Sequence, residues 1–245
     1  MTGAFLNAIG ILLGGLVGLA LRQSLSLRLQ VSVRSALGLA TIFFGLRLVW
    51  LSLGGTFWSA LEQILITFLA VLLGFWIGRL LRLQQLSNRL GRRAGRWIAA
   101  AQTNAPPKAG EGFAACAVLF CAAPLGWLGA VADGLSGYFY LLAVKAVMDG
   151  LATMGFVRSH GWPTALSAFP VWIFLGAITL ACRLYVAPFL DSHSLREPDL
   201  INSVNAAAGL VTWAVALIIF EVRKVELASF LPGLAVAPLL AWLFR

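Results

Sequence analysis

The chain alternates between long apolar runs and short segments that hold most of its charged residues. A helix needs about 20 apolar residues to cross roughly 30 Å of hydrocarbon, because each residue adds about 1.5 Å. The pattern predicts about eight such helices, and therefore an all-α polytopic membrane protein. The expected spans are residues 3–21, 31–53, 57–81, 111–132, 139–157, 163–183, 200–220 and 225–244.

The basic segment 82–110, between the third and fourth spans, has another pattern. Leu83, Leu86, Leu90 and Trp97 recur at helical spacing, and arginines occupy the other faces. This pattern predicts an amphipathic helix that lies on a membrane surface on the cytoplasmic side. Anionic lipid headgroups are then the expected partners of its basic residues.

Composition agrees with the membrane class. Hydrophobic residues make up 60% of the chain and charged residues 11%, and the mean hydropathy is +0.91. Soluble domains are about 45–50% apolar and about 25% charged, so this chain is expected to be a single membrane domain.

Cys116, Cys121 and Cys182 lie inside apolar runs, which predicts small hydrophobic side chains and no disulfide or metal site. Because the GxSxG, HExxH, Walker and Cys/His metal motifs are absent from the sequence, no enzyme, catalytic residue or cofactor is predicted.

The net charge of +9 is interpreted as a topology signal and not as nucleic-acid binding, since Lys and Arg lie almost wholly between the spans. Thirteen of the 18 basic residues fall on one predicted side of the membrane and three on the other. Cytoplasmic loops carry the excess of Lys and Arg, so the richer side is expected in the cytoplasm and both termini outside.

A weak internal repeat organises the spans. Residues 32–41 match residues 203–212 at six of ten positions. Shorter matches in the same order pair residues 4–5 with 168–169 and residues 69–71 with 234–236. Spans one to three (1–81) are therefore expected to recur as spans six to eight (163–245) around a central hairpin (111–157), in a 3+2+3 arrangement. An odd number of crossings separates the copies, so the repeat is inverted, which is typical of alternating-access carriers and some channels.

Glycines mark a packing face in the first span. Gly10, Gly14 and Gly18 recur every four residues, so they line one face of the helix. Small residues at that spacing let a second helix approach closely. The face permits a homo-oligomer but does not require one.

Two charges in the fifth span need an explanation. Lys145 and Asp149 lie in the middle of apolar sequence. Insertion of a central Lys or Asp costs about 2.5–3.5 kcal/mol, whereas each Leu, Ile, Val or Phe gains only about 0.3–0.6 kcal/mol. This span is therefore expected to need partners inside the bundle. Residues four apart share a helical face and can pair, so the two charges mark a substrate or ion path, or else a neutralised pair that fixes helix packing.

Four further polar residues are candidates for the same site. Glu111 begins the fourth span on the cytoplasmic side and Asp133 ends it on the outer side, where they would serve as entrance groups. Asn7 and Asn205 occupy the first and seventh spans and are expected to contribute through the repeat.

These observations favour transport of a small solute or ion. The alternative is a non-transporting scaffold or regulator that binds lipid or a partner protein through its basic loop. A water-accessible cavity that reaches Asp149 would favour transport, and a dry, paired contact between Lys145 and Asp149 would favour the scaffold.

Several landmarks resemble one family. They are Gly110-Glu111-Gly112-Phe113, Asp133-Gly134, Lys145 to Gly150, Phe169-Pro170 and Phe230 to Leu234. Together they are similar to the YdfK/YqgA-like bacterial membrane proteins, known as domain of unknown function 554. The resemblance implies a polytopic bacterial inner-membrane protein and supplies no activity. The chain departs from the family pattern at Phe174-Leu175-Gly176 and at residues 215–220, where polar residues are expected in relatives.

Overall fold

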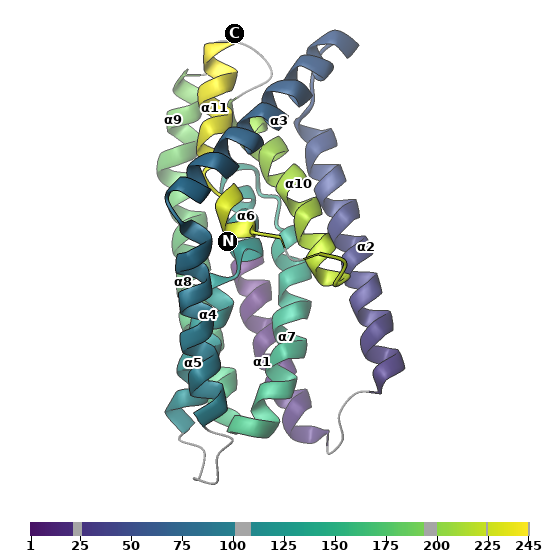
Figure 1. The fold of residues 1–245 in the computed structure, drawn as a ribbon, viewed down its shortest axis with the longest axis vertical. Helices are drawn as coiled ribbons and strands as arrows, with labels where there is room; N and C mark the ends of the chain where they lie inside the picture. The colour runs from purple at the N-terminus through teal and green to yellow at the C-terminus, as the bar shows by residue number, and fades with distance from the viewer. Residues whose placement is uncertain (22–25, 101–108, 194–199, 224, 245) are drawn as a thin grey trace.

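The computed structural model describes residues 1–21, 26–100, 109–193, 200–223 and 225–244, leaving out the side chains of 97–100, 109 and 111. The regular elements of the described part are all helical (Figure 1). In chain order they are α1 (Thr2–Ala20), α2 (Leu27–Ser52), α3 (Phe57–Leu80), α4 (Leu83–Ala100), α5 (Ala109–Ala122), α6 (Pro124–Ser136), α7 (Tyr140–His160), η1 (Trp162–Ser167), α8 (Ala168–Ala181), η2 (Cys182–Val186), α9 (Ala187–His193), α10 (Leu200–Ile219), η3 (Leu227–Phe230) and α11 (Gly233–Leu243).

The apolar runs predict most of the long helices correctly. Within the described residues, 6 helices are long and apolar enough to cross a membrane, or up to 7 if one bent pair counts as a span. Five of them, α1, α2, α3, α7 and α10, begin and end within a few residues of the predicted spans. The sixth is longer than predicted, because η1, α8, η2 and α9 form one stretch from Trp162 to His193. The chain is thus a helical membrane protein.

The last predicted span, 225–244, is shorter in the structure. It consists of η3 and the 11-residue helix α11. Pro232 stands immediately before α11, where proline is tolerated because the first N–H groups of a helix have no partner within it, and Pro238 lies inside α11. Eleven residues are fewer than the roughly 20 that cross a bilayer upright. A total of eight spans therefore stays a prediction.

The fourth predicted span is broken, although the sequence pattern predicts a continuous run over 111–132. The segments Gly112–Ala122 and Pro124–Ser136 meet at an angle of 59°. Ala123, between them, has an extended backbone. The physical reason is Pro124, which lacks an N–H and disfavours the helical conformation of the residue before it.

The glycine face of α1 packs on α7 of the same chain. Gly10, Gly14 and Gly18 lie directly against Ala146, Gly150 and Met154. A Cβ atom placed on Gly150 would lie 2.6 Å from the Gly10 carbonyl oxygen, so the two backbones are in contact. The predicted close approach is confirmed, and its partner is intramolecular.

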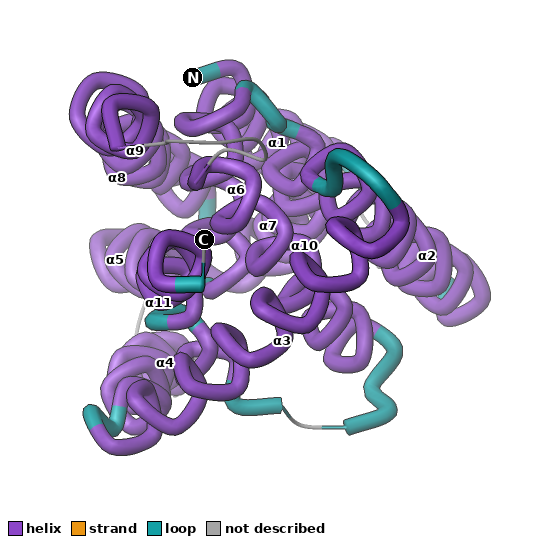
Figure 2. Tube along the Cα trace, turned by 90° about the horizontal axis from the view of Figure 1, so that it is seen from above, coloured by secondary structure: helices purple, strands orange, loops and turns teal. Residues whose placement is uncertain are grey.

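The other helices surround this pair. Seen along the long axis, α6 and α7 lie near the middle of the bundle and α2 and α4 lie at its edge (Figure 2). The turn between α6 and α7 is held against α2, because the Tyr138 hydroxyl donates a hydrogen bond to the Phe44 carbonyl at 2.7 Å. This contact helps to fix where α7, the carrier of both intramembrane charges, begins.

The amphipathic helix predicted in 82–110 is present as α4. It packs against the other helices of the protein and is not separate from the bundle. It runs lengthwise beside α5 (Figure 1). Ala94 on α4 is fully buried, and Leu83, Leu86 and Leu90 face a groove formed with α5, α6 and α8. The reason is that α5 offers the apolar face of α4 a protein surface to pack on.

Candidate functional site

The two intramembrane charges form a buried ion pair. The Lys145 ammonium contacts the Oδ2 atom of Asp149, and the two residues are 1% and 7% exposed. The Asn7 side chain, fully buried on α1, donates a hydrogen bond from Nδ2 to the same oxygen at 3.1 Å. Asn7 reaches the carboxylate because the glycine face holds α1 tightly on α7. The structure thus brings together three of the six predicted site residues.

The surroundings of Lys145 explain how a charge is accommodated there. Its Nζ atom lies 5.7 Å from the ring centroid of Phe120, close to the end of α5. A cation is favoured both over an aromatic face and near a helix C-terminus. Gly126 makes room for the lysine chain, since a Cβ atom at that position would lie 2.8 Å from Lys145 Cε. The break between α5 and α6 therefore lies beside the charge pair.

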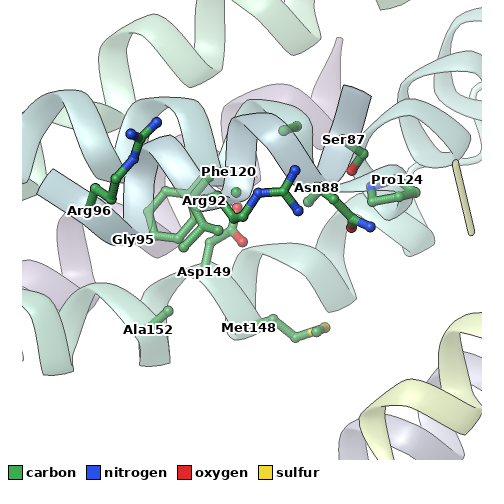
Figure 3. Close-up of a pocket in the computed structure, with 14 residues that line it drawn as sticks. Ser87, Asn88, Arg92, Gly95, Arg96, Phe120, Pro124, Met148, Asp149 and Ala152 are labelled. Atoms are coloured by element: carbon green, nitrogen blue, oxygen red, sulfur yellow. The ribbon is translucent and has the colours of Figure 1, made fainter. Parts of the chain in front are cut away.

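Asp149 also lines a cavity of about 1160 Å³. Its walls come from α4, α5, α7 and the break at Ala123. Figure 3 shows the Arg92 guanidinium pointing along α4 toward Asn88, with Asp149 on the neighbouring helix α7. The lining residues are Ser87, Asn88, Gly91, Arg92, Gly95, Arg96, Leu119, Phe120, Ala122, Ala123, Pro124, Met148, Asp149 and Ala152. Both features that would separate transport from a scaffold are thus present, an ion pair and a cavity that reaches it.

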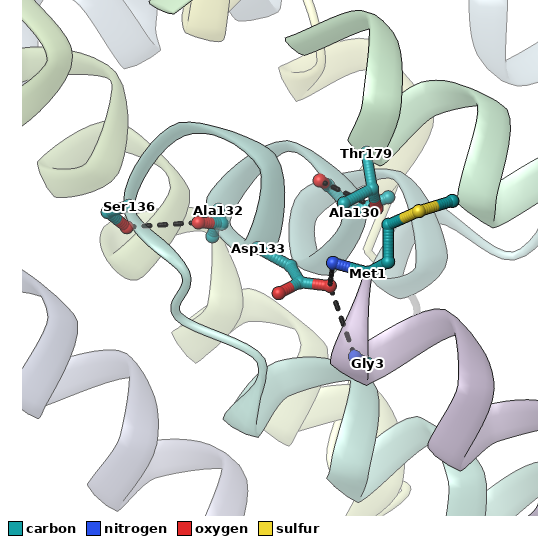
Figure 4. Close-up of polar contacts among 7 residues, drawn as sticks. All are labelled: Met1, Gly3, Ala130, Ala132, Asp133, Ser136 and Thr179. Atoms are coloured by element: carbon teal, nitrogen blue, oxygen red, sulfur yellow. Dashed lines mark hydrogen bonds and ion pairs between the residues drawn. The ribbon is translucent and has the colours of Figure 1, made fainter. Parts of the chain in front are cut away.

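Asp133 lies outside that cavity lining, in a different contact. Its carboxylate is 3.2 Å from the Met1 amino group and accepts a hydrogen bond from the Gly3 backbone N–H at 3.1 Å (Figure 4). A carboxylate at a helix N-terminus caps exposed N–H groups and interacts favourably with the helix dipole. Asp133 is buried on α6 and holds the start of α1. This is a packing role, whereas the sequence predicted an entrance group.

The remaining two candidates are not joined to the pair. Asn205 is buried on α10, and its Oδ1 atom has no hydrogen-bond partner among the described residues. It does not line the cavity at Asp149. The side chain of Glu111 lies outside the described part of the chain, so the predicted entrance role stays a prediction.

Sequence reasoning missed the α4 side of the site. Asn88, Arg92 and Arg96 follow one another at intervals of four residues and line the cavity, which the regular spacing of polar residues in 82–110 could have indicated. Sequence reasoning also missed the break between α5 and α6, which Pro124 could have indicated. All three cysteines are free thiols, and no cluster of three His, Cys, Asp or Glu side chains forms within the described residues.

Comparison with known proteins gives a family and no activity. A family model described as "Protein of unknown function (DUF554)" matches residues 2–242. The "Uncharacterized protein YqgA" of Escherichia coli (strain K12) is 29% identical over 236 residues, which cover 96% of this chain and 94% of that protein. The "Uncharacterized membrane protein YdfK" of Bacillus subtilis (strain 168) is 22% identical over 245 residues, covering 100% of this chain and 97% of the relative. No solved structure matches the chain significantly.

Proposed function

Since the chain belongs to the DUF554 family, whose function is unknown, we propose an activity from the site itself: transport of a small solute or ion. The observation that carries this proposal is the buried Lys145–Asp149 pair, whose Asp149 lines a cavity of about 1160 Å³. Ionisable residues are costly inside a membrane and are found where they line substrate or ion paths. The proposal includes no catalytic step.

The arrangement of helices supports this proposal. α2 packs on α10, α1 on α8 and α3 on α11. In Figure 1 the two members of each pair run in opposite directions, as expected for spans one to three repeated upside down as spans six to eight. The break between α5 and α6 lies beside the ion pair, and broken helices next to the site are common in carriers with inverted repeats.

The proposed location is the bacterial inner membrane, with both termini outside the cytoplasm. Figure 1 places the ends of α1, α4 and α7 and the starts of α2 and α5 at one end of the bundle. Arg28, Arg34, Arg96 and Arg158 lie on or near these helix ends. Cytoplasmic ends of spans are rich in Lys and Arg, so this end is assigned to the cytoplasm.

A scaffold or regulator is the second candidate, and the ion pair itself favours it. Lys145 and Asn7 both direct their donors at Asp149 Oδ2, so the charge is neutralised without any ligand. A buried pair of this kind can fix helix packing with no transport role. The two candidates differ in whether water reaches the pair.

Cysteine labelling tests water access. In a chain whose three cysteines are replaced by alanine, Ala152→Cys places a thiol on the cavity wall of α7. We expect a membrane-impermeant maleimide to label it in inverted membrane vesicles at least about tenfold faster than Val147→Cys, because thiolate reactivity requires contact with water. Val147 is the matched control, since it is 48% exposed on the same helix but lies in an apolar groove with α1. Equal rates would favour the scaffold.

Flux through proteoliposomes tests transport directly. We expect the protein to raise the flux of at least one probe among H⁺, Na⁺, K⁺ and Cl⁻ above that of protein-free liposomes. The charge-free variant Lys145→Met/Asp149→Asn is expected to lower this flux by about tenfold or more, because both ionisable groups of the path are removed. Gel filtration and circular dichroism check that the variant is folded. Flux that is unchanged in the folded variant would contradict the proposed role of the pair.

A further inference from the structure

The helix α4 separates two cavities of different character. On one side, Asn88, Arg92 and Arg96 line the cavity that reaches Asp149. On the other side, Leu83, Leu86 and Leu90 line an apolar groove of about 640 Å³ against α5, α6 and α8. The two cavities meet, because Ser87, Ala122 and Pro124 line both.

The basic side of α4 is open to a ligand. Arg92 and Arg96 are four residues apart on one face, and neither forms an ion pair with the described residues. The one carboxylate in this cavity lining belongs to Asp149, which is already paired with Lys145. A Cβ atom on Gly91 or Gly95, beside the arginines, would meet nothing within 4 Å, so the space over this face is open. Two free guanidinium groups therefore give the cavity wall a net positive charge.

The groove on the other side is suited to a hydrocarbon chain. Leu86, Val118, Trp127 and Phe174 contribute to an almost wholly apolar lining, and Leu86 is itself exposed. In a membrane protein such a groove faces acyl chains. An acyl chain has no polar atoms to satisfy, so van der Waals packing alone can hold it in the groove.

We propose that α4 binds one anionic phospholipid, with its phosphate on Arg92 and Arg96 and one acyl chain in the groove beneath Leu86 and Leu90. Arginine forms paired hydrogen bonds to phosphate oxygens, and Asn88 adds an amide within the same row. The chain passes from one cavity to the other over Ala122. A bilayer supplies this ligand at high local concentration. Both proposals concern the cavity that Asp149 lines, but the tests below measure lipid binding and no flux, so the two are decided separately.

Lipid binding to the purified full-length protein tests the proposal. The probes are fluorescent phosphatidylglycerol, fluorescent phosphatidylcholine and glycerol phosphate, each titrated into the protein in detergent. We expect phosphatidylglycerol to bind at least about tenfold tighter than phosphatidylcholine, and we expect about 1 M salt to remove most of the difference, because salt screens exposed charges. Equal affinities of the two lipids for the wild-type protein would overturn the proposal.

Two variants locate the lipid. Arg92→Gln/Arg96→Gln is expected to lower the affinity for phosphatidylglycerol to that for phosphatidylcholine. The matched control Arg89→Gln/Arg93→Gln removes two charges from the same helix that line neither cavity, and it is expected to keep the preference. Ala122→Phe, at the junction, is expected to weaken binding of both lipids. A preference retained in the first variant, or lost equally in the control, would overturn the proposed site.

Titration with glycerol phosphate tests whether the ligand is a lipid or a soluble phosphate. Glycerol phosphate carries the charged group of phosphatidylglycerol without the acyl chains, so we expect binding at least about a hundredfold weaker, since burial of apolar surface is lost. Binding as tight as that of the lipid would show that the ligand is a soluble phosphate and would overturn the lipid proposal. The wild-type comparisons decide the question even if a variant fails to fold.

Discussion

Replacing Lys145 by methionine is expected to lower the free energy of unfolding by about 3–5 kcal/mol, the usual cost of removing one partner of a buried ion pair. The methionine has a similar length, so it can fill the space beside Gly126 and Phe120 without opening a cavity. The loss then comes from Asp149, whose carboxyl group would be left without its cation at 7% exposure, with only the Asn7 amide as a side-chain donor. SDS titration of the purified protein, followed by circular dichroism, measures this change.

The second substitution Asp149→Asn is expected to restore most of the lost stability. Lys145→Met/Asp149→Asn carries no charge at the site, and the asparagine Oδ1 atom can still accept from Asn7. Exchange of a buried ion pair for uncharged residues is often neutral for stability, so the double variant should be more stable than the Lys145→Met single variant. A double variant that is less stable than that single variant would contradict the view that an unpaired charge causes the loss. Flux measurements on the double variant are then free of a folding defect.

Replacing Gly150 by alanine is expected to lower the free energy of unfolding. The added Cβ atom would lie 2.6 Å from the Gly10 carbonyl oxygen, and this backbone atom cannot rotate away as a side chain could. The two helices must separate, at an overpacking cost of about 1–3 kcal/mol. Separation also draws Asn7 away from Asp149, so flux in proteoliposomes should fall along with the free energy of unfolding.

Gly155→Ala is the matched control for this change. Gly155 lies on the same helix, and a Cβ atom there would meet nothing within 4 Å. Both substitutions gain the same intrinsic helix preference of alanine over glycine, about 0.5–1 kcal/mol, so the difference between them isolates packing. Gly155→Ala should be neutral or slightly stabilising, and equal stabilities of the two variants would contradict the close contact of α1 with α7.

The site could be predicted from the sequence only in part. Lys145 and Asp149 were found because charge in apolar sequence is costly, and their spacing of four residues indicated that they can pair. Asn7 was proposed through the repeat, and it meets Asp149 because of the glycine face. The same reasoning selected Asn205, which lies away from the cavity lining. Whether such an asparagine reaches Asp149 depends on how its helix is rotated about its own axis. The hydropathy pattern does not specify that rotation.

Arg92 and Arg96 illustrate a different limit. Their place on an amphipathic helix was predicted, and so was an affinity for anionic headgroups. Their position on the wall of a cavity with Asp149 depends on α4 packing lengthwise against α5, the next helix along the chain. That packing results from contacts between two separate helices, which no local pattern of residues records.

The sequence alone determined that this is a helical membrane protein, because the length and polarity of each apolar run must match the hydrocarbon core. It also determined which residues are costly there and which helix face permits close packing. The tertiary structure decided that the fourth run bends at Ala123, that α7 is the partner of the glycine face, and that Asp149 opens onto a cavity shared with α4. These features depend on which helices meet and at what rotation, and both are set by packing over the whole bundle.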